Sequence, residues 1–496
     1  MIIYWYIYYR LAVKALKKNH RRLDHMFYTK IKCALLTCFL FSALIDAQVP
    51  GPDMPFGKEA FKIYKTAVEL RTAKGHQQVP KLANYLASEF QKGGFDSKDI
   101  HVLRIGETAA LVVRYRGDDS LGKKPISISA HMDVVDAMRD DWTRDPFTLI
   151  EEDGYFFGRG TGDDKLGMTA VVTAFLRLKS EGWVPGRDLI IAFSGDEETG
   201  METTQALVNE YRYLTDSEFV LNADSGGATI PEDGGTPSSF GMQAAEKTYV
   251  TWEITARNPG GHSSRPRQDN AIYDLANAIT AIQNHQFPVN YNDLTLQFFK
   301  GTGKKTSGVL GKAMRAFADN PNDKKAIKEL RSSSSYVGTL GTTCVATMLR
   351  AGHAENALPQ SATATINCRI FPGTGIDNTL NQLKKAINNS QIDFVMLGVP
   401  TETDPSPLRD DVTLALQKAI DIKYPGLEII PSMSSGGTDG MHFRAAGIPS
   451  YGVNGGYGKA SDSFAHGLNE RILVQSFYDN LAHWYVLLPA IASSKN

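Results

Sequence analysis

Cysteine and tryptophan are scarce in this chain of 496 residues, which holds four of the first and five of the second. Only two of the cysteines lie outside residues 1–47, which is too few for a structural zinc site built from cysteine alone. Neither an internal repeat nor a low-complexity tract is present. A surplus of positive charge is missing as well: 53 Lys+Arg face 54 Asp+Glu, a formal net charge of −1. A nucleic-acid surface is therefore not expected.

The remaining composition is that of a folded soluble chain. The hydrophobic fraction of 42% and the charged fraction of 22% lie near the averages for such chains. They argue against extended disorder, a collagen-like repeat and a multi-span membrane protein. At roughly 150 residues per domain, the length predicts two or three domains.

Residues 1–47 have the pattern of a leader. Lys30 and Lys32 form a positive region before the apolar run 33–45, which is the order of a secretory signal peptide. The run is short for a bilayer span of about 20 residues, so an N-terminal anchor helix is the weaker alternative. We expect an exported protein, periplasmic or secreted, that begins near Gln48.

Met26 offers a second start, which would leave residues 1–25 untranslated.

The leader also changes the charge balance. Residues 1–47 hold eight of the basic residues and two of the acidic ones, so 45 basic and 52 acidic residues remain. The chain from Gln48 onward is therefore acidic, with a formal net charge of −7.

Between about residues 110 and 224, apolar β-branched runs alternate with a helical pattern. Such alternation indicates βαβ units. We therefore predict an α/β domain with a mixed, mostly parallel sheet and helices on both faces. The strands are ALVVRYRG, KPISISA, DLIIAFSG and EFVLNAD, and the helix is GMTAVVTAFLRLK.

Around Thr248 the pattern changes to the order β-α-β-β-α-β, which predicts an inserted α+β domain with a ferredoxin-like plan. Residues 300–335 are additional to this plan, polar and partly helical, with a serine run typical of a flexible loop. After Pro405 the α/β pattern resumes. The predicted domains are 48–245 and 403–496 for the catalytic domain, and 246–402 for an inserted lid or dimerisation domain.

Two cysteines, Cys344 and Cys368, lie outside the leader. They fall in β-like runs that are symmetric about Asn356, so they can face each other across a hairpin. A disulfide and two buried free thiols are both compatible with this pattern.

Polar side chains gather where the predicted strands end. His131 follows KPISISA, and Asp133 can hold the N–H of its ring from two positions on. Asp163 precedes a helix, where a helix cap is the alternative interpretation. Glu197 and Glu198 adjoin an apolar strand end, where repulsion and desolvation make paired carboxylates costly without a bound cation.

Asp224 and His466 complete the set, each in a loop next to glycines. Carboxylates and imidazoles are the ligands of hard to borderline divalent metals. If they converge, five ligands exceed the need of one tetrahedral zinc ion. Two ions that share a bridging carboxylate are then favoured.

The motifs SAHMDVVDA, GRGTGDDKLG, SGDEETG, NADSGG, GGHSSRP and AHGLNE occur in this order. Together they resemble the di-zinc metallohydrolase family of carboxypeptidase G, aminoacylase, carnosinase-type dipeptidases, acetylornithine deacetylase and succinyl-diaminopimelate desuccinylase. The resemblance covers nearly all of the chain from about residue 55. It implies a zinc exopeptidase-like fold with the inserted lid.

The resemblance also implies roles for individual residues. His131 and Asp224 would hold one zinc ion, Glu198 and His466 the other, and Asp163 would bridge the two. Co²⁺ or Mn²⁺ would be able to substitute for zinc. A cis peptide bond would follow the bridging residue, between Asp163 and Asp164. Asp224 is an aspartate, as in the peptidase and aminoacylase branches, which disfavours the desuccinylase branch.

Four further roles follow from the same resemblance. Glu197 matches the general base that takes a proton from the attacking water, and Asp133 the carboxylate behind His131. His262 resembles the residue that stabilises the oxyanion, often in the active site of a partner subunit; by itself it reads as a turn histidine. Arg369 and Asn356 resemble the residues that hold the substrate carboxylate and backbone, although Arg369 also fits a solvated strand position.

We therefore expect a zinc-dependent metallopeptidase of carboxypeptidase or dipeptidase type, which cuts an amide bond next to a free carboxylate. A homodimer formed through the inserted domain is expected as well. The alternative within enzymes is an N-acyl-amino-acid amidohydrolase. A catalytically inactive binding protein on the same scaffold is a remote alternative, because Glu197 and all five metal positions are intact.

Overall fold

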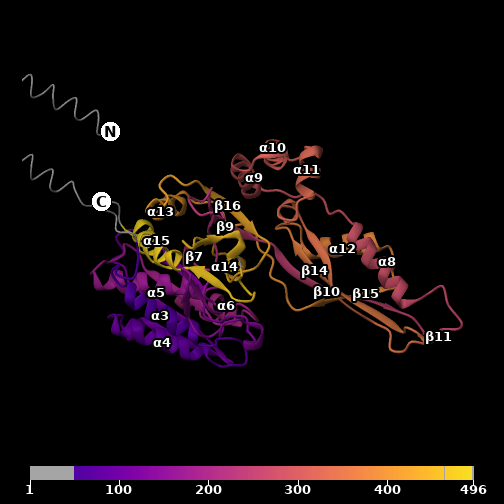
Figure 1. Cartoon of the computed structure of the whole chain (residues 1–496), viewed down its shortest axis with the longest axis horizontal. Helices are drawn as coiled ribbons and strands as arrows, with labels where there is room; N and C mark the ends of the chain where they lie inside the picture. Colours follow the sequence, from indigo (N-terminus) through magenta and orange to yellow (C-terminus); the bar gives the residue numbers. More distant parts are fainter. Residues whose placement is uncertain (1–49, 463, 494–496) are drawn as a thin grey trace, which may run out of the picture. The chain divides into compact units, whose positions relative to one another are not determined.

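The computed structural model describes residues 50–462 and 464–493 (Figure 1). The predicted leader, its cleavage point and the alternative start at Met26 lie outside the described residues. Within them, no helix combines the length and apolar character needed to cross a membrane.

A ten-stranded sheet forms the core of the larger α/β part. Its order is β1-β2-β6-β3-β7-β17-β9-β8-β18, and β16 pairs with β9. Four neighbouring strands run parallel to one another: β6, β3, β7 and β17. The antiparallel pairs are β1 with β2, β2 with β6, and β9 with both β8 and β17. The predicted mixed, mostly parallel sheet is confirmed. The strands are Ile100–Ile105 (β1), Thr108–Tyr115 (β2), Ile126–His131 (β3), Leu189–Ser194 (β6), Phe219–Asn222 (β7), Gly227–Ile230 (β8), Phe240–Glu246 (β9), Ile429–Ser434 (β16), Ser450–Gly452 (β17) and Tyr457–Lys459 (β18).

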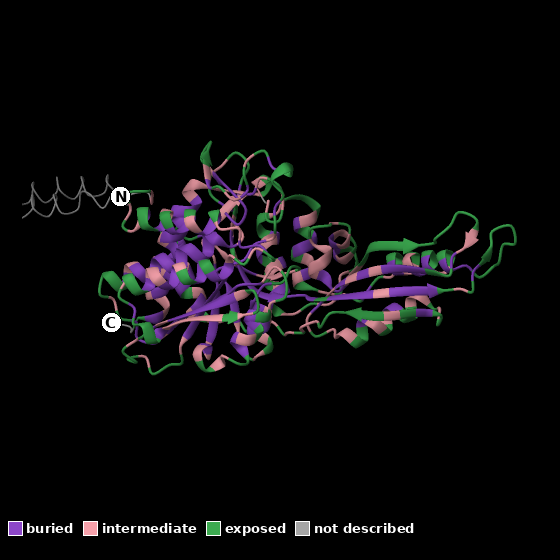
Figure 2. Ribbon diagram, turned by 90° about the horizontal axis from the view of Figure 1, so that it is seen from below, coloured by how far each residue is buried: buried purple, intermediate pink, exposed green. Residues whose placement is uncertain are grey.

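Helices cover both faces of this sheet because successive strand residues point to opposite sides. Ile191 of β6 belongs to the larger core, whereas its neighbour Ile190 belongs to a smaller core on the other face. Figure 2 shows the buried residues concentrated around this sheet. Helices of the larger core are Gly57–Glu69 (α3), Val79–Lys92 (α4), Lys165–Ser180 (α5), Asp410–Ile420 (α13) and Val474–Ala492 (α15), and those of the smaller one are Glu202–Val208 (α6) and Gly440–Ala445 (α14).

A second, four-stranded sheet has the order β12-β14-β10-β15, with every neighbouring pair antiparallel. Together with two helices this is the β-α-β-β-α-β plan predicted from the sequence. Alternate residues such as Trp252 and Ile254 pack beneath the helices. The elements are Thr248–Arg257 (β10), Ala271–Asn284 (α8), Thr343–Ala351 (β12), Ser361–Ile370 (β14), Ile376–Ile387 (α12) and Ile392–Leu397 (β15). The exact domain limits stay predictions.

The additional segment is more ordered than its polar composition suggests. It forms the helices Asp293–Lys305 (α9), Gly308–Asp319 (α10) and Lys324–Arg331 (α11) around a small apolar core. Helix α9 packs against β16, where Gly301 lies over the side chain of Ile430. The segment expected to be partly helical forms a helical subdomain, because Phe299, Met314 and Phe317 supply a core of its own.

Cys344 and Cys368 are paired residues of β12 and β14, and they form a disulfide. The structure thereby decides between the two alternatives that the sequence left open. The bond joins two neighbouring strands of the inserted sheet.

Candidate metal centre

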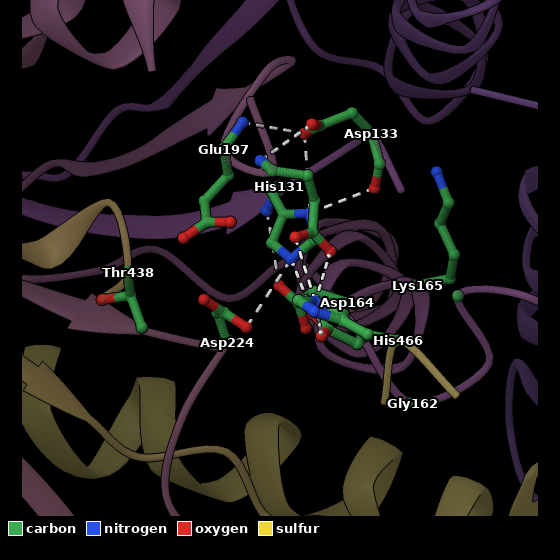
Figure 3. A network of polar contacts seen from close by, with 12 residues as sticks. His131, Asp133, Gly162, Asp164, Lys165, Glu197, Asp224, Thr438 and His466 are labelled. Atoms are coloured by element: carbon green, nitrogen blue, oxygen red, sulfur yellow. Dashed lines mark hydrogen bonds and ion pairs between the residues drawn. The ribbon is translucent and has the colours of Figure 1, made fainter. Parts of the chain in front are cut away.

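The carboxyl ends of three adjacent parallel strands meet at one place. β3 ends at His131, β6 leads to Glu197 and Glu198, and β7 leads to Asp224. Side chains at such an edge converge because parallel strands end on the same side of the sheet. Asp163, just before α5, and His466, from a distant loop, join them. Figure 3 shows His131, Asp224 and His466 close to one another.

Asp163 lies between two histidines and faces each with a different oxygen. Its Oδ1 lies 2.9 Å from Nε2 of His131, and its Oδ2 lies 3.2 Å from Nε2 of His466. His466 Nε2 is also 3.0 Å from Glu198 Oε1, and His131 Nε2 is 3.6 Å from Asp224 Oδ1. This is the arrangement expected of a bridging carboxylate with one imidazole on either side.

The ligand atoms form two groups that share this residue. Within each group all atoms lie within 4.8 Å of one another: His131, Asp163 and Asp224 in the first, and Asp163, Glu198 and His466 in the second. Oxygen and imidazole nitrogen suit zinc and similar divalent ions. The donor set therefore fits two metal ions, and the structure brings together all five residues predicted as ligands. The peptide bond between Asp163 and Asp164 is cis, as the resemblance implies.

The charges of these groups depend on one another. Burial disfavours the charged form of His131, but Asp133, Asp163 and Asp224 outweigh it and raise its pKa well above the ordinary value. Hydrogen bonds with Asp163 and Glu198 raise the pKa of His466 to about 10. Burial raises the pKa of Asp224 to about 6. Without metal, protons on the histidines partly compensate the crowded carboxylates, and bound cations would take over that role.

Asp133 supports the site by fixing main-chain groups. Its Oδ1 accepts the N–H of Glu197 at 3.1 Å, and its Oδ2 accepts that of Glu198 at 3.0 Å. Nδ1 of His131 lies 3.1 Å from the main-chain oxygen of Asp133 and 3.6 Å from its carboxylate. The carboxylate thus holds the turn with the two glutamates, and the ring is held chiefly by the main chain.

Glu197 is placed to exchange protons. Among the described residues its carboxylate has no hydrogen-bond partner, although an oxygen of it lies within 4.8 Å of ligand atoms of His131 and Glu198. Burial and the neighbouring carboxylates of Asp224, Asp439 and Glu198 raise its pKa well above the ordinary value. A carboxylate with a raised pKa and no fixed partner suits a general base.

Two supporting residues were missed in the sequence. Glu470 accepts the main-chain N–H of Gly162 at 2.8 Å and of Asp163 at 3.1 Å, and its other oxygen binds Arg159 at 2.8 Å. Both charged side chains are buried. The signal was present, because Glu470 ends the motif AHGLNE and Arg159 belongs to GRGTGDDKLG, but neither motif showed that they meet.

Asp439 and Lys165 were also missed. Asp439 accepts hydrogen bonds from the hydroxyls of Ser194 and Thr204, and burial raises its pKa to about 7. Lys165 is fully buried and donates to the Thr72 hydroxyl at 2.8 Å and to the carbonyl of Met132, the residue after His131. Burial lowers the pKa of Lys165 to about 7. The burial of Lys165 could not be predicted from the sequence, because lysine side chains are normally exposed.

Three predicted residues lie in the inserted domain and outside this cluster. His262 is exposed and pairs with Ala357 in a two-stranded ribbon, formed by Gly261–His262 (β11) and Ala357–Leu358 (β13), which Figure 1 shows at the far end of the second sheet. Asn356 accepts the N–H of Ser263 with its carbonyl at 2.9 Å. Arg369, on β14, stacks on the Tyr249 ring with Cζ 4.5 Å from its centre. His262 and Asn356 are thus neighbours, while Arg369 stands apart from them.

A carboxylate that lies between two imidazoles, with an unbonded glutamate nearby, is the arrangement of a metal-dependent hydrolase. The chain belongs to the peptidase family M20/M25/M40, whose model matches residues 127–489. It is accordingly a hydrolase of amide C–N bonds, and the family recognised in the motifs is confirmed.

Individual relatives agree with this family. The chain is 27% identical over 397 residues to the probable carboxypeptidase S-like 2 of Dictyostelium discoideum, covering 78% of this chain and 75% of that one. It is 29% identical over 377 residues to the N-fatty-acyl-amino acid synthase/hydrolase PM20D1 of Xenopus tropicalis, covering 73% and 72%. The fold resembles the M20 family metallo-carboxypeptidase Sso-CP2 of Sulfolobus solfataricus, with a TM-score of 0.66, 19% identity and coverage of 87% and 99%.

Proposed function

We propose that this protein is an exported, di-zinc exopeptidase of carboxypeptidase or dipeptidase type, which hydrolyses an amide bond next to a free carboxylate. The observation that carries the proposal is the position of Asp163 between His131 and His466. In this assignment His131 and Asp224 would hold one zinc ion, Glu198 and His466 the other, and Asp163 both. When bound, such ions supply Lewis acidity that polarises a carbonyl and makes water easier to deprotonate.

Glu197 would move the proton. It takes a proton from the attacking water and later gives it to the nitrogen of the leaving amine, so that the carboxylate is regenerated. Asp133 keeps Glu197 in place through its main-chain N–H. The raised pKa of Glu197 favours the first half of this transfer, because a stronger base is a better proton acceptor.

Arg369 would recognise the free carboxylate of the substrate. It is half-buried, and among the described residues its guanidinium has no hydrogen-bond or carboxylate partner, only the Tyr249 ring. Burial lowers its pKa, which reflects the cost of holding an unpaired cation there. An arginine in that state is available for a two-pronged contact with a carboxylate.

A homodimer through the inserted domain would bring His262 to a metal centre. The edge strand β12 supports this part of the proposal, since Val345, Met348 and Leu349 are exposed along it. An exposed edge with apolar residues is suited to pairing with a second strand. In such a dimer His262, with Asn356 beside it, would support the oxyanion in the partner's site.

The second candidate is hydrolysis of N-acyl amino acids, which the PM20D1 relative favours. Both candidates need the metals, Glu197 and a substrate carboxylate. The zinc-loaded protein should therefore be assayed side by side on a dipeptide panel and on N-acetyl and N-fatty-acyl amino acids, with a chelator control. Turnover confined to acyl amino acids would replace the peptidase proposal, and turnover that survives chelation would contradict both.

A further inference from the structure

Positive charge is concentrated in the helical subdomain. Residues 293–331 hold nine Lys/Arg and four Asp/Glu, a formal net charge of +5. The remainder of the chain from Gln48 onward holds 36 basic and 48 acidic residues, a net charge of −12. The subdomain therefore differs in sign from the rest of the protein. Its three helices pack in succession, and Figure 1 shows α9 beside β16.

Some of this charge is used inside the protein. Lys304 and Lys305 lie 3.3 and 3.5 Å from the carboxylate of Glu428. Arg331 donates to Gln286 at 2.6 Å and to a carbonyl at 2.7 Å, and Arg315 donates to the carbonyl of Gly303. Both arginines of the subdomain are thereby engaged in internal contacts.

The other five lysines make no such contacts. They are exposed, and their ammonium groups have no hydrogen-bond or ion-pair partner among the residues that the structure describes. We call them the basic surface: Lys300, Lys312, Lys324, Lys325 and Lys328.

Helical spacing places two of these lysines together. Lys324 and Lys328 are one turn apart on α11, on the side opposite the buried Ala326 and Leu330. On α10, Val309 is 67% exposed and lies one turn before Lys312. An apolar side chain beside an unpaired lysine is a combination that a lipid interface accepts, since the apolar group can enter the headgroup layer.

We propose that the basic surface docks the enzyme on an anionic lipid surface. Lysine side chains are flexible, which suits a diffuse layer of negative headgroups. Each lysine near such a surface adds to the attraction between protein and lipid. A nucleic-acid site would instead use arginines and exposed aromatic rings, yet here both arginines are occupied. The acidic remainder of the chain is repelled by the same lipids, so docking would orient the subdomain toward them.

The test is cosedimentation with vesicles of phosphatidylcholine, pure or with about 30% phosphatidylserine, an anionic lipid. The basic-surface variant is K312E/K324E/K325E/K328E. A matched control, K62E/K81E/K123E/K418E, makes the same change in net charge at exposed lysines elsewhere whose ammonium groups have no hydrogen-bond or ion-pair partner among the described residues. All proteins carry the same N-terminus, so any contribution of the leader cancels.

We expect the wild type to bind only the anionic vesicles, and added salt to weaken this binding. The basic-surface variant should bind at least about tenfold more weakly, and the control should not, because each lysine near the lipid contributes. Equal binding to pure phosphatidylcholine would overturn the proposal, and so would an equal loss in the control. Binding of a short RNA without binding of vesicles would assign the surface to nucleic acid instead. If the fourfold variant does not fold, the proposal is tested with the K324Q/K325Q variant and with the salt titration of the wild type, both of which should show weaker binding to the anionic vesicles.

Discussion

Arg159 and Glu470 form a buried ion pair, with Nη1 of Arg159 2.8 Å from Oε2 of Glu470, although 311 residues separate them. Each side chain is at most 3% exposed. The pair joins the loop that carries Asp163 to the loop that carries His466. Two of the proposed metal ligands therefore depend on one contact.

Replacing Glu470 by glutamine should destabilise the metal-free protein by about 3–5 kcal/mol, because the Arg159 cation stays buried without a counter-charge. Urea unfolding in the presence of a chelator measures this loss. E152Q is the matched control, since Glu152 pairs with Arg144 at a more exposed position, and it should cost less than about 1 kcal/mol. Equal effects of the two variants would contradict the role given to Glu470.

Glu197→Gln should keep the metal content and lose nearly all turnover. The amide cannot accept the proton of the attacking water, while the proposed ligands stay in place. Metal analysis of the purified variant and its kcat on the best wild-type substrate are the two measurements. A variant with wild-type turnover would exclude Glu197 as the general base.

Arg369→Met should raise KM for substrates with a free carboxylate by about 10- to 100-fold, the equivalent of a lost charge-assisted contact of about 1.4–2.8 kcal/mol. The same substrates with an amidated carboxyl end should be cleaved equally by the variant and the wild type. Arg350→Met, on the neighbouring strand β12, is the control, because Arg350 is bound to Glu253 at 2.7 Å. A similar rise in KM for amidated substrates would show that Arg369 acts only on structure.

His483 should make stability depend on pH. It is buried and its Nε2 donates to the carbonyl of Val453 at 2.9 Å, and burial lowers its pKa from 6.5 to about 4. Between these values the unfolded chain binds the proton and the folded chain does not. The free energy of unfolding should therefore fall by up to about 3 kcal/mol as the pH drops from about 6.5 to about 4.

The matched variant is His483→Gln, which keeps a donor for Val453 and removes the titrating group. Urea unfolding of both proteins, with chelator present throughout, isolates this contribution from metal binding. The difference between the two proteins should change over that pH range. A constant difference would mean that His483 titrates alike in the folded and unfolded chains.

The sequence by itself determined the α/β core, the ferredoxin-like insertion and the residues that meet at the metal centre. Strand and helix periodicity is local, and parallel strands such as β3 and β7 must end at the same edge, so His131 and Asp224 could be placed together without coordinates. The ordered motifs then supplied Asp163, Glu198 and His466.

Only the tertiary structure decided which groups support that centre. Arg159 and Glu470 are brought together by long-range packing, and no local pattern encodes such a pairing. For Cys344 and Cys368 the symmetric strands indicated that the two can face each other, but only the structure decided for a disulfide. The helical subdomain was underestimated for a similar reason: its apolar residues, Phe299 and Phe317 among them, form a core only after three helices pack. Burial likewise made Lys165 an internal donor, because solvent exposure belongs to the fold and cannot be read from a single residue.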